Sequence, residues 1–503
     1  MEGFIADGTD CTGSMEGLVL IGKLQDLFIN LLNPWIPIVG KLKDKTKYAV
    51  ITGCFFAMLV LFCIVRYVLY KESYFYNTTC GIVLMIIIAI MSLDRSLVRV
   101  HWRRSVWIAW FGMCIAFTIS DILVPKKVCG LGLVLALVFT GVFFVWQNHT
   151  RKDLLWKCFK DAVKLGFWMM VIISFLFRPL YEGGRYAGIF TNPNTFALYL
   201  LAIFSVYMSD LDWIVETGKD WKRCISTYVS LAIIFFYLNI SQARTSMLAI
   251  VCVCLLWLSF RIYISKKNRA WKMFLKNIIL VMVFSVTLYP LLKAGATHVP
   301  NWVGKPIVFE GESLYMGDGN KVENLGETVV AESGKFESSE VKEEAPQGVL
   351  DRIWYIVDKH DGLNALTSGR IDIYKGYTKK LNLKGHKNVS LVINGKRKNH
   401  AHNNWLQFGY TYGVISMIFY GIITILALGM SMKFYLQHRR KNATYAFLVP
   451  AICFGFVVAT LAECLFLPFE VFPAFAFWFV FGDLFVKKVP KNKLLLELEE
   501  RDT

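Results

Sequence analysis

The chain has 503 residues, of which 55% are hydrophobic and 18% charged. Its mean hydropathy of +0.47 excludes an ordinary water-soluble enzyme of two or three domains. The formal net charge of +18 would suit a nucleic-acid-binding protein, but the cations are distributed as membrane topology requires.

Apolar runs of about 20 residues, the length that crosses a bilayer core, recur along the chain. They predict an all-α polytopic membrane protein with about twelve transmembrane helices. The segment ahead of the first run, LVLIGKLQDLFINLL, is amphipathic, and we expect no cleaved signal peptide. The expected helices cover about 48–70, 77–93, 104–123, 127–147, 162–178, 194–210, 225–241, 243–264, 272–293, 404–431, 444–466 and 470–486.

Lys and Arg gather in every second connection between these helices. Five such connections and the stretch ahead of the first helix carry three or four each, and the intervening short connections carry none to two. Because basic loops stay in the cytoplasm, this pattern predicts a multi-pass protein of the cytoplasmic (inner or plasma) membrane with both termini cytoplasmic. Membrane lipids, and not nucleic acid, are then the expected surroundings. The basic stretches are 41–47, 94–104, 149–160, 209–224, 265–272, 433–441 and the tail from Lys487.

One connection is much longer than the others and falls on the extracytoplasmic side. Its first part, FEGESLYMGDGNKVENLGETVVAESGKFESSEVKEEAP, is acidic and poor in apolar residues, which predicts a mobile flap. Its second part has helical periodicity around 350–357 and again in IDIYKGYTKKL. The expected organisation is a cytoplasmic amphipathic segment at 1–47, nine transmembrane helices at 48–293, the large loop at 294–403, three transmembrane helices at 404–486 and a cytoplasmic tail at 487–503.

Four polar clusters border the apolar segments on the predicted outer side. Three of them contain an arginine beside Gly, Ser or Thr, and we expect Arg185, Arg244 and Arg370 to converge on an anionic group. A guanidinium binds phosphate oxygens bidentately and stays charged. Each arginine taken alone also fits an interfacial anchor or a solvated loop residue. The clusters are RYAGIFTNPN at 185–194, SQART at 241–245, SGR at 368–370 and HAHNNW at 400–405.

Neutral polar residues accompany these arginines. Asn192, or alternatively Thr191, is placed to cap the helix that Pro193 opens, which leaves backbone N–H groups facing an anion. Asn194, Ser241 and Asn403 are expected to support the same site.

His402 is the candidate catalytic residue. It precedes the tenth expected helix, and a histidine with an ordinary pKa near 6.5 can accept a proton from a sugar hydroxyl. The alternatives are an ordinary loop histidine and a metal site formed with His400. No HExxH motif or carboxylate cluster adjoins the pair, so we expect neither a metal nor another cofactor.

Acidic residues complete the set of candidates. The DLD triplet of Asp210 and Asp212 is similar to a metal–diphosphate motif, but the charge count places it on the cytoplasmic side, where we expect a solvated helix end. Glu463, near the outer end of the eleventh expected helix, is expected to pair with one of the arginines.

The order R-x-x-G-x-F-x-N-P-N, S-x-A-R-T, S-G-R and H-x-N resembles the O-antigen ligase-like family, which includes O-antigen ligases and Wzy-type polysaccharide polymerases. The resemblance covers about 178 to 430. It implies a metal-independent, inverting glycosyltransferase of the membrane-embedded type C. By position, Arg185 and Arg244 match the family's diphosphate-contacting arginines, His402 matches its essential histidine, and Arg370 matches less closely.

The implied reaction moves a glycan from undecaprenyl diphosphate to an acceptor hydroxyl on the outer face of the membrane. The product would be a surface polysaccharide such as O-antigen, capsule or exopolysaccharide. A polymerase and an O-antigen ligase, acting on a glycan or lipid acceptor beside other polysaccharide assembly proteins, fit the motifs equally. A flippase or transporter of lipid-linked glycans is the alternative from another class, and it would be expected to show internal repeats.

Overall fold

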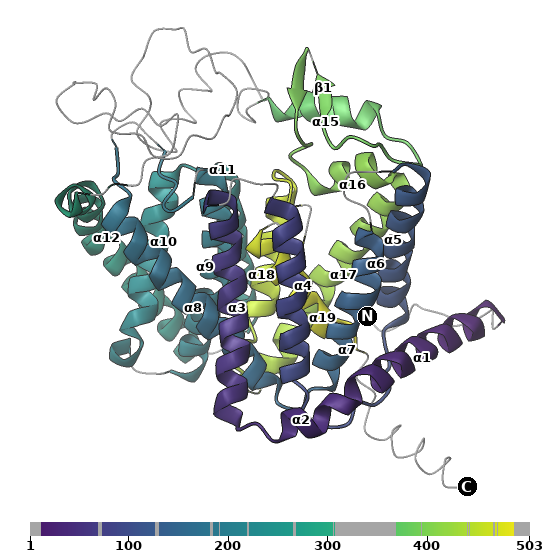
Figure 1. Ribbon diagram of the computed structural model, residues 1–503. Helices are drawn as coiled ribbons and strands as arrows, with labels where there is room; N and C mark the ends of the chain where they lie inside the picture. Colours follow the sequence, from purple (N-terminus) through teal and green to yellow (C-terminus); the bar gives the residue numbers. More distant parts are fainter. Residues whose placement is uncertain are drawn as a thin grey trace.

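The computed structural model describes most of the chain and places it as a helical bundle (Figure 1). A connection between α12 and α15 and the two ends of the chain lie outside the described residues. The described ranges are 12–68, 73–125, 130–181, 185–190, 192–218, 221–264, 268–304, 306, 369–393, 395–439, 441, 443–465, 468–469 and 471–486.

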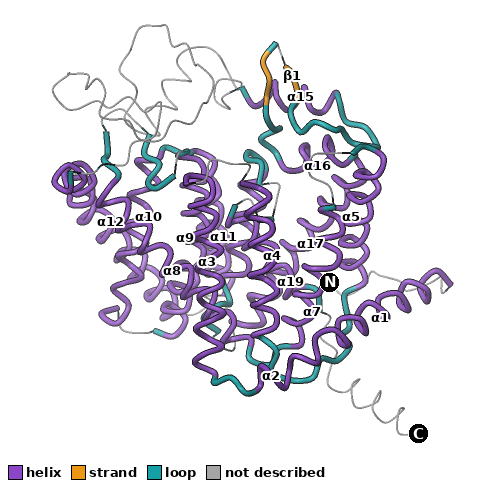
Figure 2. The backbone as a smooth tube through the Cα atoms, viewed as in Figure 1, coloured by secondary structure: helices purple, strands orange, loops and turns teal. Residues whose placement is uncertain are grey.

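Helices dominate the described residues, and the one sheet among them is a small antiparallel hairpin (Figure 2). The first elements are α1 (Thr12–Leu32), η1 (Asn33–Trp35), α2 (Ile36–Gly40), α3 (Asp44–Val68), α4 (Ser73–Met91), α5 (Arg104–Leu123), α6 (Leu131–Val134), the π-helical turn η2 (Leu135–Phe139), α7 (Thr140–Asn148) and α8 (Lys152–Phe177). The others are α9 (Pro193–Thr217), η3 (Trp221–Cys224), α10 (Ile225–Ser241), α11 (Arg244–Ile264), α12 (Asn268–Val303), α15 (Arg370–Lys379), β1 (Leu391–Ile393), β2 (Lys396–Lys398), α16 (Asn404–Tyr412), α17 (Val414–Arg439), α18 (Leu448–Thr460) and α19 (Phe472–Leu484).

The fold is that of an all-α membrane protein. Among the described residues, six helices are long and apolar enough to cross a bilayer, and four further apolar helices are shorter. α19 is apolar on every side and is buried along its whole length, as expected for the centre of a bundle. α12 is the opposite case, because no residue of its apolar window is buried, so its apolar surface suits contact with lipid.

The tenth expected helix, 404–431, is wrong as a single helix, because the chain breaks between α16 and α17. Gly413 stands at the break with φ +90°, a conformation that strongly favours glycine. A Cβ there would lie 2.1 Å from the carbonyl oxygen of Leu383. The break therefore lets 382–383 pass against the helix, where Val414 N donates to Asn382 O over 2.9 Å.

Parts of the long connection can be compared with the sequence-based expectation. α15 confirms the helix expected in IDIYKGYTKKL, whereas the hairpin of β1 and β2 was not anticipated. The acidic flap expected at 309–346, the helix expected near 350–357 and the tail from 487 lie outside the described residues.

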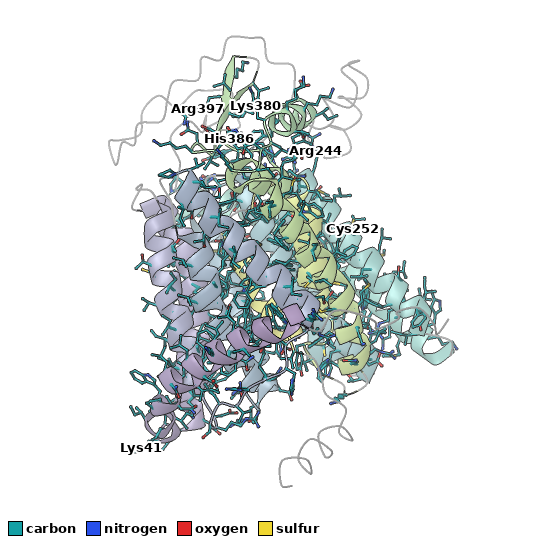
Figure 3. The ribbon with its side chains drawn as sticks, turned by 90° about the vertical axis from the view of Figure 1, so that its right-hand side faces the viewer. Lys41, Arg244, Cys252, Lys380, His386 and Arg397 are labelled. Carbon is teal, nitrogen blue, oxygen red and sulfur yellow. The ribbon has the colours of Figure 1, made fainter. Side chains whose placement is uncertain are left out.

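The bundle has two distinct ends (Figures 1 and 3). We call the end that carries α15, the hairpin and α16 the α15 end, and the end that carries α1 and α2 the α1 end. Figure 3 shows Arg244, Lys380 and Arg397 toward the α15 end, and Lys41 at the α1 end.

Candidate functional site

The turn between α10 and α11 joins the polar clusters at the α15 end. α10 ends at Ser241, and Gln242 then takes the left-handed conformation with φ 51°. Ser241 and Gln242 are both buried, so the turn is packed into the protein. Its residues contact the 185–194 segment on one side and α15 on the other, as the following bonds show.

Arg185 is held by hydrogen bonds to this turn and to the start of α9. Its Nε donates to Ser241 O over 3.1 Å, and its Nη2 donates to Asn194 Oδ1 over 2.7 Å and to Gln242 O over 3.4 Å. The next residue, Tyr186, fixes the backbone, because its N donates to Ile240 O over 3.0 Å. These three acceptors are neutral oxygens, and the bonds to them orient the guanidinium between the turn and the start of α9.

Arg370 meets the same turn from the other side. As the first residue of α15, it donates from Nη1 to Thr245 Oγ1 over 3.0 Å and from Nη2 to Glu463 Oε1 over 2.6 Å. The pairing of Glu463 with an arginine, expected from the sequence, is confirmed and falls on Arg370. A guanidinium that already contacts a carboxylate has less of its charge available for a phosphate.

Glu463 also faces His402. Its Oε2 lies 3.6 Å from His402 Nδ1, which is longer than a normal hydrogen bond and makes this an electrostatic contact. The two oxygens of one carboxylate are thus divided between the Arg370 guanidinium and the His402 imidazole. The His402 side chain keeps 32% of its surface exposed, against 10% for Glu463, so the ring is the accessible member of this pair.

The charge of Glu463 is stabilised by its neighbours. Burial raises the pKa of this carboxyl, but contacts with His402 and Arg370 lower it by more, so the pKa lies below its ordinary value of 4.5. The carboxylate is therefore ionised at neutral pH. An anion beside Nδ1 favours the proton on that nitrogen, which leaves Nε2 as the proton acceptor.

His402 is positioned by its backbone as well as by Glu463. It adopts φ 50°, which is unusual for a residue other than glycine. Tyr374 Oη donates to His402 O over 3.0 Å and to Leu461 O over 2.9 Å, which ties α15 to the turn that carries Glu463. Tyr374 was not singled out from the sequence, because its importance comes from partners 28 and 87 residues away.

Arg244 is the first residue of α11 and is half-buried. In the sequence it lies between the turn residues that bond Arg185 and the residue that bonds Arg370. Its neighbour Thr245 bonds Arg370, while Ser241 and Gln242 bond Arg185. Figure 3 shows Arg244 toward the α15 end, near the elements that carry Arg370 and His402. At the start of a helix its charge adds to the positive end of the helix dipole.

The supporting residues act mainly as helix caps and tethers. Asn192 is the N-cap of α9, and its Oδ1 accepts from Asn194 N over 2.8 Å, as predicted from the sequence. Asn403 is the N-cap of α16, accepts from Leu406 N and donates to Leu461 O over 3.0 Å. The part of Ser241 that reaches Arg185 is its carbonyl, since its hydroxyl bonds Leu238 O.

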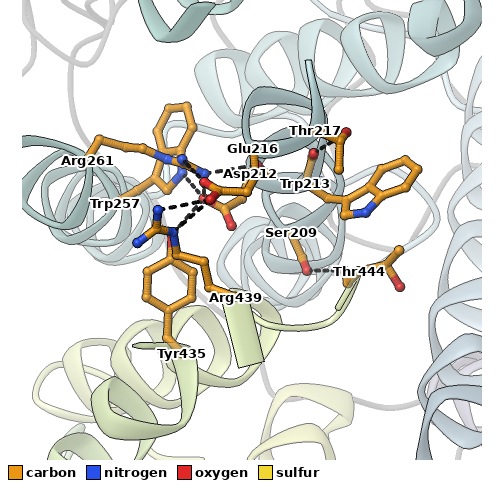
Figure 4. Close-up of polar contacts among 10 residues, drawn as sticks. All are labelled: Ser209, Asp212, Trp213, Glu216, Thr217, Trp257, Arg261, Tyr435, Arg439 and Thr444. Atoms are coloured by element: carbon orange, nitrogen blue, oxygen red, sulfur yellow. Dashed lines mark hydrogen bonds and ion pairs between the residues drawn. The ribbon is translucent and has the colours of Figure 1, made fainter. Parts of the chain in front are cut away.

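The expectation that Asp210 and Asp212 form a solvated helix end is wrong, and Figure 4 shows the buried contacts of Asp212. Asp212 is 4% exposed and its Oδ1 accepts from Trp257 Nε1 over 2.7 Å, from Tyr435 Oη over 3.0 Å and from Arg261. Asp210 pairs with Lys160 and Lys164, each at 2.6 Å.

This buried cluster joins distant parts of the chain at the end opposite the candidate site. Glu216 accepts from Arg261 Nη1 over 2.7 Å and from Arg439 Nη2 over 2.9 Å, so α9, α11 and α17 are clamped together. Its acids are matched by cations and by buried hydroxyl and indole groups. This arrangement is typical of a structural contact and not of a ligand site.

A structural observation and a comparison with known proteins also bear on the site. Among the residues that the structure describes, no three of His, Cys, Asp and Glu gather as metal ligands would. The sequence matches no known protein-family model, and no curated protein is similar to it.

Proposed function

We propose that the protein is a membrane glycosyltransferase that moves a glycan from undecaprenyl diphosphate to an acceptor hydroxyl. The supporting observation is the set of hydrogen bonds at the 241–245 turn. Ser241 bonds Arg185 on one side, and Thr245 bonds Arg370 and Glu463 on the other. It gathers guanidinium groups and an accessible imidazole at one end of a helical membrane protein. That combination suits a lipid-borne anion and a hydroxyl nucleophile.

The proposed chemistry is a single displacement. The acceptor oxygen forms a bond to the anomeric carbon, the bond from that carbon to the diphosphate breaks, and the diphosphate leaves with the electron pair. Arg185 and Arg244 stabilise the growing charge of the leaving group, because preorganised cations favour the transition state over the ground state. Arg370 contributes less to the phosphate, since Glu463 already shares its charge.

His402 is the proposed general base. It takes the proton of the acceptor hydroxyl on Nε2 while Glu463 stabilises the imidazolium through Nδ1. Loss of a general base lowers rates by roughly 10²–10⁴-fold. No metal or other cofactor takes part in the proposed reaction.

The proposal includes an orientation. The α15 end faces the extracytoplasmic side of the cytoplasmic membrane, and both termini are cytoplasmic. The basic short connections, represented by Lys41 in Figure 3, support this assignment. The donor then reaches the site from the outer leaflet, with its prenyl tail among the apolar helix surfaces.

The test is a transfer assay with purified protein and a glycan linked to undecaprenyl diphosphate. Wild-type protein should release the diphosphate lipid and extend the glycan, whereas Arg244→Ala and His402→Ala should lose transfer by roughly 10²-fold or more. Two exposed residues provide matched controls, His101 ahead of α5 and Arg104 at its first position. Arg104→Ala and His101→Ala should keep full activity.

Electrophoresis of the product separates the two members of this class. A ladder formed from donor alone indicates a polymerase, and a product that needs a second acceptor indicates a ligase. Wild-type transfer rates in the His402→Ala protein would refute the catalytic assignment. Movement of the labelled donor across vesicles without any transfer would instead establish a flippase.

A further inference from the structure

The segment between the candidate arginine of α15 and His402 is strongly and one-sidedly basic. Residues 371–401 contain eight Lys or Arg and a single acid, Asp372. Seven of the eight cations are exposed, and the eighth is half-buried. We call this set the basic cap. It consists of Lys375, Lys379, Lys380, Lys384, Lys387, Lys396, Arg397 and Lys398.

The basic cap lies at the outermost part of the α15 end (Figures 1 and 3). α15, the 380–390 connection and the hairpin form a layer on top of α16, and the hairpin projects away from the bundle. Lys380 and Arg397 lie together in this layer (Figure 3). No ion pair involves a cap residue in the part of the chain that the structure describes.

The cap shares its elements with the candidate site. α15 begins with Arg370, and β2 leads within four residues to His402. Tyr377 joins α15 to the strands, since its Oη donates to Val389 O over 3.1 Å and to Lys398 O over 3.4 Å. The cap is therefore fixed relative to His402, and a polymer lying on it would have one end near the imidazole.

We propose that the basic cap binds an anionic glycan, meaning a polysaccharide that carries carboxylate or phosphate groups. The biological role of the basic cap rests on the proposed glycan transfer. In that reaction the bound polymer is the acceptor or the growing product. Seven exposed cations and one half-buried cation hold a small anion weakly, but they hold a chain of repeated charges through many contacts at once. Charge complementarity thus selects an acidic polymer.

The position of the cap favours a polymer over lipid headgroups. Headgroups surround the ends of the membrane helices, whereas the backbone of the hairpin, which carries three of the cations, projects beyond those ends (Figure 2). A neutral polysaccharide would gain nothing from the charges. The proposal therefore assigns the glycan substrate to the acidic class.

The test measures binding and not transfer. Fluorescently labelled oligogalacturonate and a neutral maltooligosaccharide of equal length are titrated with the purified full-length protein in detergent, and anisotropy is recorded. The acidic probe should bind at least about tenfold more tightly, and its affinity should fall as salt rises, because the Debye length shortens from about 10 Å at 0.1 M to about 3 Å at 1 M. Equal binding of both probes would overturn the inference.

Variants locate the binding surface. Replacing Lys396, Arg397 and Lys398 together by Gln should weaken acidic binding by about fivefold, since each exposed contact is individually weak. A second triple variant, Lys379→Gln with Lys380→Gln and Lys384→Gln, does the same without altering the strands. Lys41→Gln with Lys43→Gln and Lys45→Gln, three exposed lysines at the α1 end, is the matched control and should bind normally.

Further arms identify other occupants and separate this inference from the proposed function. If the protein binds anionic vesicles but not the acidic probe, the occupant of the cap is lipid and the proposal is overturned. If the probe binds only after residues 312–345 are deleted, the occupant is the chain's own acidic segment and the proposal is also overturned. His402→Ala should abolish transfer and leave anisotropy unchanged. If the wild-type protein transfers glycan but does not bind the acidic probe, only the inference about the basic cap is refuted. If it binds the acidic probe but does not transfer glycan, only the proposed function is refuted.

Discussion

Charged side chains meet at both ends of the bundle, but they differ in exposure and in how their partners are shared. At the α1 end, Asp212 and Arg261 keep only 5% and 3% of their side-chain surface exposed. At the α15 end, Glu463 is 10% exposed, whereas its partners Arg370 and His402 are 18% and 32% exposed. The Asp212–Arg261 pair is closed to solvent, although Glu216 and Arg439 at the edge of its cluster keep 21% and 20% of their side-chain surface exposed. The cluster at the α15 end turns its imidazole toward solvent.

The comparison shows why a run of charges in a sequence does not reveal its role. A closed pair has used its hydrogen-bonding capacity inside the protein and serves to hold helices together. A carboxylate shared between a guanidinium and an accessible imidazole leaves the ring able to accept a proton. The exposure of the imidazole, and not the presence of an acid, distinguishes the shared carboxylate of Glu463 from the closed Asp212–Arg261 pair.

The largest effect is expected from breaking the closed cluster. Asp212→Ala leaves Arg261 buried without its main carboxylate partner, and loss of one member of a buried pair costs about 3–5 kcal/mol. Thermal unfolding in detergent should therefore show a large fall in melting temperature. Combining the change with Arg261→Met removes the stranded charge and should restore much of the loss.

The exposed pair of Asp26 and Arg99, also at the α1 end, is the matched control. Their side chains are 38% and 64% exposed, so Asp26→Ala should leave the melting temperature nearly unchanged. A wild-type melting temperature for Asp212→Ala would contradict the assignment of a structural role to this cluster.

Removing the charge of Glu463, the carboxylate shared by Arg370 and His402, should affect catalysis more than stability. Glu463→Gln keeps the shape and removes the charge beside His402 Nδ1. We expect transfer to fall by roughly 10–10²-fold, less than removal of the general base itself. The loss should fall on kcat and not on KM, because Glu463 acts through His402 and not on the substrate.

The pH profile distinguishes this positioning role from a structural one. The shape of the rate against pH should differ between wild type and Glu463→Gln, because the variant lacks the ionised carboxylate beside Nδ1. Glu463→Asp, which keeps the charge, should recover part of the activity. An unchanged pH profile together with a lower melting temperature would mean that Glu463 only holds the turn.

The helices themselves could be predicted from the sequence, because each depends on an apolar run within one segment. Asn192 could be identified as a cap for the same reason, since it bonds Asn194 two residues away. The break at Gly413 could not, because its cause is the carbonyl of Leu383, in another segment.

The charged clusters were harder to predict because their partners are distant in sequence. Asp212 reaches Arg261 across 49 residues and Tyr435 across 223. Glu463 reaches Arg370 across 93, although its acidic character in an apolar setting was enough to predict some cationic partner. Local pattern thus located the polar positions, and only the packing of the helices separated the shared cluster from the closed one.

A smaller effect is expected from acid. The pKa of Glu463 is lowered in the folded chain, so its contribution to stability is fully present above the ordinary value of 4.5 and is lost as pH falls below it. The difference in melting temperature between wild type and Glu463→Gln should be largest near neutral pH and should narrow below pH 4.5. A difference that stays constant with pH would exclude a contribution from the ionised carboxylate.

The smallest effect concerns the caps that orient the α15 end. Asn192→Ala removes the side-chain acceptor at the start of α9, and loss of an N-cap costs about 1 kcal/mol. Asn192→Asp keeps an acceptor and should restore stability, measured by thermal unfolding, but it places a negative charge beside the site. If Arg185 and the start of α9 receive a diphosphate, the aspartate should weaken donor binding while the alanine should not. Equal donor affinity in both variants would show that the positive field of this end does not extend to Asn192.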